Sequence, residues 1–216
     1  MVAAMSLDET VTDEYLKKVR EYTTESIAFF SDENKPERER CVVRALLRCL
    51  GVPFTEKDLL VDQPEPVDVA ALGARFQVTE VLFEDRRRHQ EYKKRLENLN
   101  QLTSDEELWG PWKNPRPVSG GEVVRRVRNR LLEKTAHSDI DALVYVNLGQ
   151  TFLNVDSPRP DFSEFAVLGW RSVSAVYLPY ALVMHAGENA PAFLRNALGS
   201  ALSAWMGPDG WFEPDA

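Results

Sequence analysis

A glycine between two β-rich runs constrains the fold of this chain more than any other feature. Gly73-Ala74 interrupts residues 66–83, where β-branched and apolar residues alternate with polar ones. A Gly-X pair in this setting favours a two-residue type II′ hairpin turn. This turn predicts three cross-strand pairs: Leu72 with Arg75, Ala70 with Gln77, and Asp68 with Thr79.

The predicted hairpin gathers polar side chains on one face. Side chains alternate between the two faces of a strand, so Asp68, Gln77 and Thr79 share a face and Glu80 points to the other. Opposite pairs have Cβ atoms roughly 5 Å apart and diagonal pairs about 7–8 Å apart. These side chains are therefore within reach of one metal ion or one bridging water.

A carboxylate on one strand and two polar residues at i and i+2 on the next form the layout of a two-strand metal site. In these residues the chain resembles the PD-(D/E)xK, or restriction-endonuclease-like, superfamily, and in particular a bacterial family described as putative endonucleases. Pro66-Val67-Asp68 stands where that family has Pro-Asp, with one residue inserted. Gln77-Val78-Thr79 stands where it has (Asp/Glu)-x-Lys. The resemblance extends over most of the chain.

The resemblance implies a fold, a cofactor and a site. It implies an α/β fold, a three-layer α/β/α sandwich with a mixed central sheet, and Mg²⁺ or Mn²⁺ as the cofactor. Asp68 would bind the metal, and Gln77 would replace the second carboxylate as a ligand. Thr79 replaces the lysine that helps to activate water or neutralise charge, which puts catalysis in question.

Three further residues could complete the site. Glu80 is adjacent, although it points to the other face unless a bulge intervenes. Lys93, or Lys94, on a following helix could reach back in place of the lysine. Glu39 lies near the apolar stripe of the helix expected over 35–50, and members of the superfamily often carry a metal-binding glutamate there. The residues leave a structural interpretation equally open: Glu39 could pair with an arginine of its own helix, and Asp68, Gln77 and Thr79 could serve only the strands.

Two basic segments are candidates for nucleic-acid contact. The first follows the hairpin and holds six basic residues, Arg86, Arg87, Arg88, Lys93, Lys94 and Arg95, against Glu91. The second lies on the helix expected over 120–134, where Arg126 and Arg130 align at i, i+4 spacing away from the apolar face. Arginines in this arrangement can contact phosphates of DNA or RNA without reading bases. Solvated helix faces are often equally basic, so that interpretation stays open.

Length and charge limit the classes of protein to which this chain can belong. The chain has 216 residues, 44% of them hydrophobic, which fits one domain over residues 1–205 followed by a loose tail at 206–216. The net charge of −8 argues against non-specific coating of DNA. The longest apolar run is too short for a membrane span, and the acidic N-terminus does not resemble a signal peptide, so we expect a cytoplasmic protein without membrane contact. Homo-oligomerisation is left open.

Periodicity predicts the order of the elements. Helices are expected over 12–30, 35–50, 86–100, 120–134, near 161–168 and after Pro191. Strands are expected near 59–61, over 142–148 and around 172–184, and a long loop over 101–118. His185 falls at a strand end, but no serine or cysteine nucleophile motif accompanies it.

Two functions therefore remain. The first is a Mg²⁺- or Mn²⁺-dependent nuclease that hydrolyses phosphodiester bonds, possessing full or degenerate activity. The second is a non-catalytic domain that binds nucleic acid or protein on a nuclease-like scaffold.

Overall fold

The computed structural model describes residues 9–82, 88–101, 115–148, 151–154 and 160–203. The chain divides into two compact units. The smaller contains residues 1–35 and 84–114, and the larger contains residues 36–83 and 115–216. The single domain expected over 1–205 stays a prediction, and the tail expected at 206–216 lies outside the described residues.

The smaller unit is a pair of helices that pack on each other. Helix α1 (Glu9–Phe29) precedes a short 3-10 helix, η1 (Asp32–Asn34), and α3 is Arg88–Gln101. These confirm the helices expected over 12–30 and 86–100. Arg20 donates two hydrogen bonds to the carbonyl of Leu99, at 2.8 and 3.2 Å, and so satisfies a carbonyl in the last turn of α3. Phe30 stacks on Tyr92 with ring centroids 5.3 Å apart.

The larger unit is built on a six-stranded mixed sheet. Its strands, in spatial order, are β1 (Val69–Ala71), β2 (Ala74–Leu82), β4 (Asp141–Asn147), β6 (Ser172–Tyr177), β7 (Tyr180–Ala186) and β8 (Ala201–Ser203). Strands β2, β4 and β6 are parallel, and the flanking pairs are antiparallel. A separate parallel pair is formed by β3 (Arg116–Ser119) and β5 (Thr151–Asn154).

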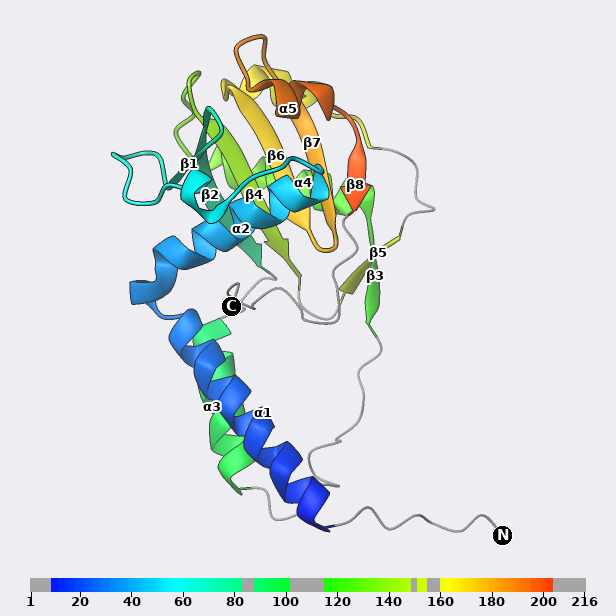
Figure 1. Ribbon diagram of the computed structural model, residues 1–216. Helices are drawn as coiled ribbons and strands as arrows, with labels where there is room; N and C mark the ends of the chain where they lie inside the picture. The colour runs from blue at the N-terminus through cyan, green and yellow to red at the C-terminus, as the bar shows by residue number, and fades with distance from the viewer. Residues whose placement is uncertain (1–8, 83–87, 102–114, 149–150, 155–159, 204–216) are drawn as a thin grey trace. The chain divides into compact units, whose positions relative to one another are not determined.

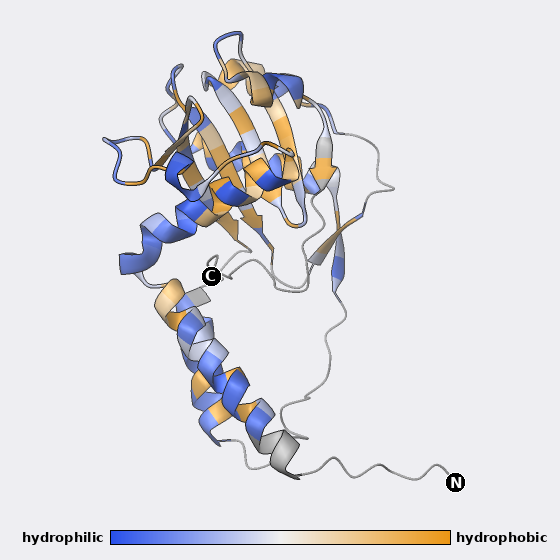
Figure 2. Cartoon of the chain, viewed as in Figure 1, coloured by the Kyte–Doolittle hydropathy of each residue, from blue (hydrophilic) through white to orange (hydrophobic). Residues whose placement is uncertain are grey.

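Helices cover both faces of this sheet (Figure 1). Helix α2 (Lys35–Cys49) and the short α5 (Ala192–Asn196) share one apolar cluster with the sheet. Helix α4 (Gly120–Leu132) and the 3-10 helix η3 (Ser163–Leu168) share the cluster on the other face. The central strands β4 and β6 are buried along most of their length and consist largely of hydrophobic residues (Figure 2), which is typical of parallel strands covered twice. The expected α/β sandwich with a mixed sheet is confirmed.

The hairpin has a different register from the expected one. Leu72 and Gly73 both have positive φ, at 51° and 83°, as a type I′ turn requires, so the turn precedes Ala74. The pairs are Ala71 with Ala74, Ala70 with Arg75 and Val69 with Phe76, and the predicted pairing of Asp68 with Thr79 is wrong. Val69 and Phe76 are fully buried, and their packing under α2 outweighs the strain at Leu72, of order 1–3 kcal/mol.

Other boundaries also differ from the expectations. The strand expected around 172–184 is two strands, β6 and β7, because Pro179 lies in the turn between them and cannot donate a ladder hydrogen bond. Residues 59–61 form only an isolated bridge, from Leu60 to Ala70. Strands β3, β5 and β8 are additions that the sequence analysis did not expect, because their runs are short and polar or mixed. None of the described helices has the length and apolarity that a membrane span requires.

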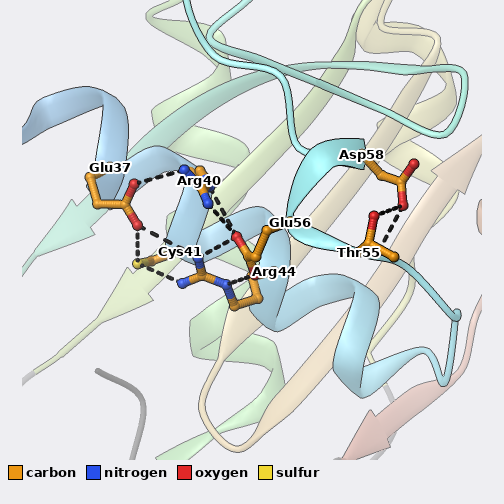
Figure 3. A network of polar contacts seen from close by, with 7 residues as sticks. All are labelled: Glu37, Arg40, Cys41, Arg44, Thr55, Glu56 and Asp58. Atoms are coloured by element: carbon orange, nitrogen blue, oxygen red, sulfur yellow. Dashed lines mark hydrogen bonds and ion pairs between the residues drawn. The ribbon is translucent and has the colours of Figure 1, made fainter. Parts of the chain in front are cut away.

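An ionic cluster fixes the start of α2 against the 3-10 helix η2 (Glu56–Asp58) (Figure 3). Arg44 Nε and Nη2 each donate to a Glu56 carboxylate oxygen at 2.8 Å, and Arg40 binds the same carboxylate. The hydrogen bond from Arg44 is the main reason that the pKa of Glu56 falls to about 2. Burial raises the pKa of the neighbouring Cys41 thiol. Arginines and glutamates neutralise each other here, so the cluster is structural.

A second ionic cluster lies at the start of β4. Asp141 is fully buried, and its carboxylate accepts hydrogen bonds from Arg171, from Ser172 Oγ at 2.7 Å and from the Arg75 amide at 2.9 Å. Arg171 also reaches the Gly73 carbonyl at 3.2 Å. This carboxylate therefore joins three neighbouring strands at one end of the sheet.

Two buried serines of β6 allow a matched test of hydroxyl burial. Ser174 Oγ has no hydrogen-bond partner among the described residues, whereas Ser172 donates to Asp141. Both side chains are fully buried. We expect Ser174→Ala to raise the free energy of unfolding by about 1 kcal/mol, because it removes a desolvated, unpaired hydroxyl. Ser172→Ala should lower it by about 1–3 kcal/mol. Urea unfolding checks both, and a loss in Ser174→Ala as large as in Ser172→Ala would contradict the difference.

Candidate functional site

At Asp68, where the pairing of the hairpin ends, a side chain takes over from the backbone as the hydrogen-bond acceptor. Its backbone amide donates to the Phe76 carbonyl at 2.9 Å, and its carboxylate Oδ2 accepts the Val78 amide at 2.8 Å. The carboxylate thus replaces a backbone acceptor beside the middle of β2. The pairing of β1 with β2 ends at Val69 and Phe76, so Asp68 lies just beyond the last pair. Its two contacts hold it beside the segment of β2 from Phe76 to Val78.

Gln77 carries an orphaned acceptor. Its side-chain oxygen Oε1 is buried and has no hydrogen-bond partner in the described part of the chain. A buried carbonyl oxygen without a donor is costly, by about 1–3 kcal/mol, and usually has a reason. Amide oxygens are acceptable ligands for Mg²⁺ and similar hard cations. This oxygen is therefore a candidate ligand for a metal ion or an ordered water.

Thr79 accepts a hydrogen bond from an arginine of α4, the helix that covers this face of the sheet. Arg130 of α4 donates from Nε to Thr79 Oγ1 at 3.0 Å, although 51 residues separate the two. Thr79 is almost completely buried, with 8% of its surface exposed. Alternation along β2 places Gln77 and Thr79 on this same face, together with Val81 of the α4-side core. A cation from another element thus contacts this position of β2.

Glu39 and Glu80 belong to the opposite face of the sheet. Because side chains alternate along a strand, Glu80 points away from the face of Thr79. It shares its face with Val78, which packs into the cluster under α2. Glu39 is buried, with 9% exposed, on α2 itself. Both predicted carboxylates therefore lie on the side away from Arg130. The structure does not bring either one onto the face that holds Gln77 and Thr79.

The protein supplies few metal ligands in the described region. No group of three or more His, Cys, Asp or Glu residues there is arranged to hold a metal ion. Asp68 and Gln77 would provide two oxygen ligands, and waters and substrate phosphate would have to complete the shell. Lys93 and Lys94 are exposed on α3 in the smaller unit, so their predicted contribution stays a prediction.

The structure places the residues predicted to contact nucleic acid in different environments. Arg86 and Arg87 lie outside the described residues. Arg126 donates to Glu122 at 3.0 and 3.1 Å, so its charge is compensated within α4. Arg130 contacts Glu133 at 2.6 Å in addition to Thr79. Of the expected stripe of free cations on α4, Arg126 is therefore compensated by its own helix, and Arg130 is paired only with the exposed Glu133.

Two other polar groups in the larger unit do not join this site. His185 lies in β7, and burial lowers its pKa more than a hydrogen bond with the backbone of Trp170 raises it. Tyr177 shares a 2.6 Å hydrogen bond with Thr151 Oγ1, and burial raises the pKa of its phenol. These contacts explain both side chains as parts of the packed sheet.

Sequence reasoning gave Arg130 as a nucleic-acid contact but missed its hydrogen bond to Thr79. Its i, i+4 spacing from Arg126 indicates a surface stripe, and no local pattern reveals that it reaches across to β2. A signal could have come from its position directly before the buried Leu131, since such a residue lies at the border of the apolar face. Such border positions allow a long side chain to lie along the sheet.

Comparison with known proteins matches this chain to a family whose description names an endonuclease. The family model described as "Putative endonuclease, protein of unknown function (DUF1780)" matches residues 12–207. No curated protein matches the chain. A solved structure from Pseudomonas aeruginosa strain PAO1 matches with a TM-score of 0.63 and 27% sequence identity, covering 90% of this chain and 96% of that one. The Pseudomonas protein is described as a protein of unknown function of the monooxygenase superfamily.

Proposed function

We propose that this chain, which belongs to the family of putative endonucleases whose model spans residues 12–207, hydrolyses phosphodiester bonds of DNA or RNA with a divalent metal ion. The observation that carries the proposal is the orphaned Gln77 oxygen, which belongs to the strand segment that anchors the Asp68 carboxylate through the Val78 amide. A carboxylate and a carbonyl oxygen are the ligands that Mg²⁺ and Mn²⁺ prefer. The finer assignment to the PD-(D/E)xK superfamily belongs to this proposal.

The chemistry needs little covalent help from the protein. In hydrolysis, a water oxygen bonds to phosphorus while the bond from phosphorus to the leaving oxygen breaks. The water loses one proton, and the leaving oxygen gains one. The metal, when bound, supplies polarisation of the phosphate and orientation of the water. Asp68 and Gln77 would hold it, with the backbone amide of Val78 fixing the Asp68 carboxylate.

The chemistry of the side chains favours this class over the monooxygenase class. A carboxylate, an amide oxygen, a hydroxyl and a guanidinium belong to or contact residues 77–79 of β2. These groups bind hard cations and phosphate oxygens. We therefore choose phosphodiester hydrolysis over the superfamily named for the Pseudomonas protein.

Titration calorimetry with Mn²⁺ and Mg²⁺ tests the proposal directly. Asp68→Asn should weaken metal binding at least about tenfold and abolish cleavage of labelled DNA and RNA, because a charged ligand is lost. Gln77→Leu should also weaken metal binding, yet it should not lower the unfolding temperature, because the replaced oxygen has no protein partner among the described residues. Asp139→Asn, at an exposed carboxylate paired with Arg75, is the control. Equal metal binding by the wild type, Asp68→Asn and Gln77→Leu would refute the metal site.

A non-catalytic binding domain is the second candidate, and Thr79 in place of a lysine favours it. In that case no metal would support cleavage of any substrate, whereas binding to an oligonucleotide would weaken with salt. Cleavage that depends on Asp68 would exclude this candidate.

A further inference from the structure

Arg130 is incompletely compensated, unlike Arg126 on the same helix. Its Nε donates to a neutral hydroxyl, Thr79 Oγ1, and its Nη1 donates to Glu133. Its Nη2 has no partner among the described residues. Glu133 is 63% exposed and three residues away on the chain, and such surface pairs contribute little. A positive charge is therefore held at β2 with one terminal amino group available for a further acceptor.

The setting of this charge favours an anion. Thr79 is buried and fixes the guanidinium, while the Arg130 side chain keeps 36% of its surface exposed. Solvent can therefore reach the guanidinium at a point where its orientation is set by the fold. A planar guanidinium with free N–H groups matches two oxygens of a phosphate. Exchange of the exposed Glu133 for a phosphate would free Nη1 for the second hydrogen bond.

Arg126 provides the contrast. It makes a hydrogen bond and an ion pair with Glu122, and its side chain is only 18% exposed. An incoming phosphate would have to displace this less exposed ion pair at Arg126, whereas at Arg130 it would displace only the exposed Glu133.

We propose that Arg130 binds the phosphate of the phosphodiester substrate on the face of β2 that holds Gln77, and that Thr79 positions its guanidinium. This inference rests on the proposed function, which it deepens by assigning the cation. The cation that binds phosphate thus comes from α4, so a lysine at the position of Thr79 on β2 is not required. Lys93 is then not needed to replace that lysine.

Binding of a fluorescein-labelled phosphorothioate oligonucleotide in the presence of Ca²⁺ tests the role of Arg130 without cleavage. We expect Arg130→Gln to weaken binding about tenfold. It should also reduce the slope of log affinity against log salt concentration by about one, the value for one lost phosphate contact. Arg130→Lys should recover part of the affinity, because the charge remains but the second donor is lost. Arg125→Gln is the matched control, since Arg125 is exposed on the same helix and has no partner among the described residues.

Thr79 is tested through its hydroxyl. Thr79→Val keeps the shape and removes the acceptor, and it should weaken oligonucleotide binding about threefold to tenfold. Thr79→Ser keeps the acceptor and should bind within about twofold of the wild type. A purely structural role of Thr79 predicts a lower unfolding temperature in Thr79→Val without this selective change in affinity.

The outcomes separate this inference from the function on which it rests. Equal affinities of Arg130→Gln and Arg125→Gln would overturn it, as would a wild type that binds no oligonucleotide at low salt. If Arg130→Gln cleaves substrate with unchanged KM and kcat, the inference fails and the nuclease proposal stands. If binding depends on Arg130 but no metal supports cleavage, the phosphate contact stands and the nuclease proposal fails. Arg130→Gln should retain the metal affinity of the wild type.

Discussion

Replacing Asp141 by alanine is expected to lower the free energy of unfolding by about 3–5 kcal/mol. The Asp141 carboxylate is fully buried and accepts hydrogen bonds from the Arg171 guanidinium, Ser172 Oγ and the Arg75 amide. Its loss leaves the Arg171 side chain, which is only 14% exposed, without its counter-charge. An unpaired buried charge is among the most destabilising consequences of a single substitution.

Urea unfolding monitored by far-ultraviolet circular dichroism checks this expectation. For a chain of this length the loss corresponds to a fall in unfolding temperature of roughly 10 °C. Asp139→Ala is the matched control, because Asp139 is 62% exposed and pairs with Arg75 at the surface. It should change the free energy of unfolding by less than about 1 kcal/mol. Equal effects of the two substitutions would show that the buried cluster contributes no more than a surface pair.

Replacing Glu56 by glutamine is expected to cost about 2 kcal/mol of stability at pH 7 and almost none at pH 2. The Glu56 pKa of about 2 in the folded protein lies below its ordinary value of 4.5. A depressed carboxyl pKa stabilises the folded state above pH 4.5, and this contribution disappears as the pH falls from 4.5 through 2. The full difference would correspond to about 3 kcal/mol. Partial exposure of Glu56, whose side chain is 32% exposed, reduces it.

The measurement is the difference in unfolding free energy between wild type and Glu56→Gln across pH 2–7. Glu37→Gln is the control within the same cluster, since Glu37 is 44% exposed and lies 3.4 and 3.6 Å from Arg40 and Arg44. It should cost less than about 1 kcal/mol. A difference between wild type and Glu56→Gln that stays constant between pH 5 and 2 would contradict the assigned cause.

The candidate site could be predicted only in part. Alternation along a strand is a local rule, so sequence alone places Gln77 and Thr79 on one face and Glu80 on the other. The register of Asp68 depends on the turn, and the burial of Val69 and Phe76 selects that turn. The contact from Arg130 to Thr79 joins elements far apart in the chain, which no spacing rule describes.

The sequence by itself determined the helices and the central strands of this protein, because apolar periodicity reflects which side of an element is buried. It therefore places α1, α2, α3, α4 and β4 within a few residues of their observed bounds. Only the tertiary structure decided the hairpin register and the cation at Thr79. These depend on which distant surfaces pack together, and the free energy of that packing is not encoded in any short stretch of residues.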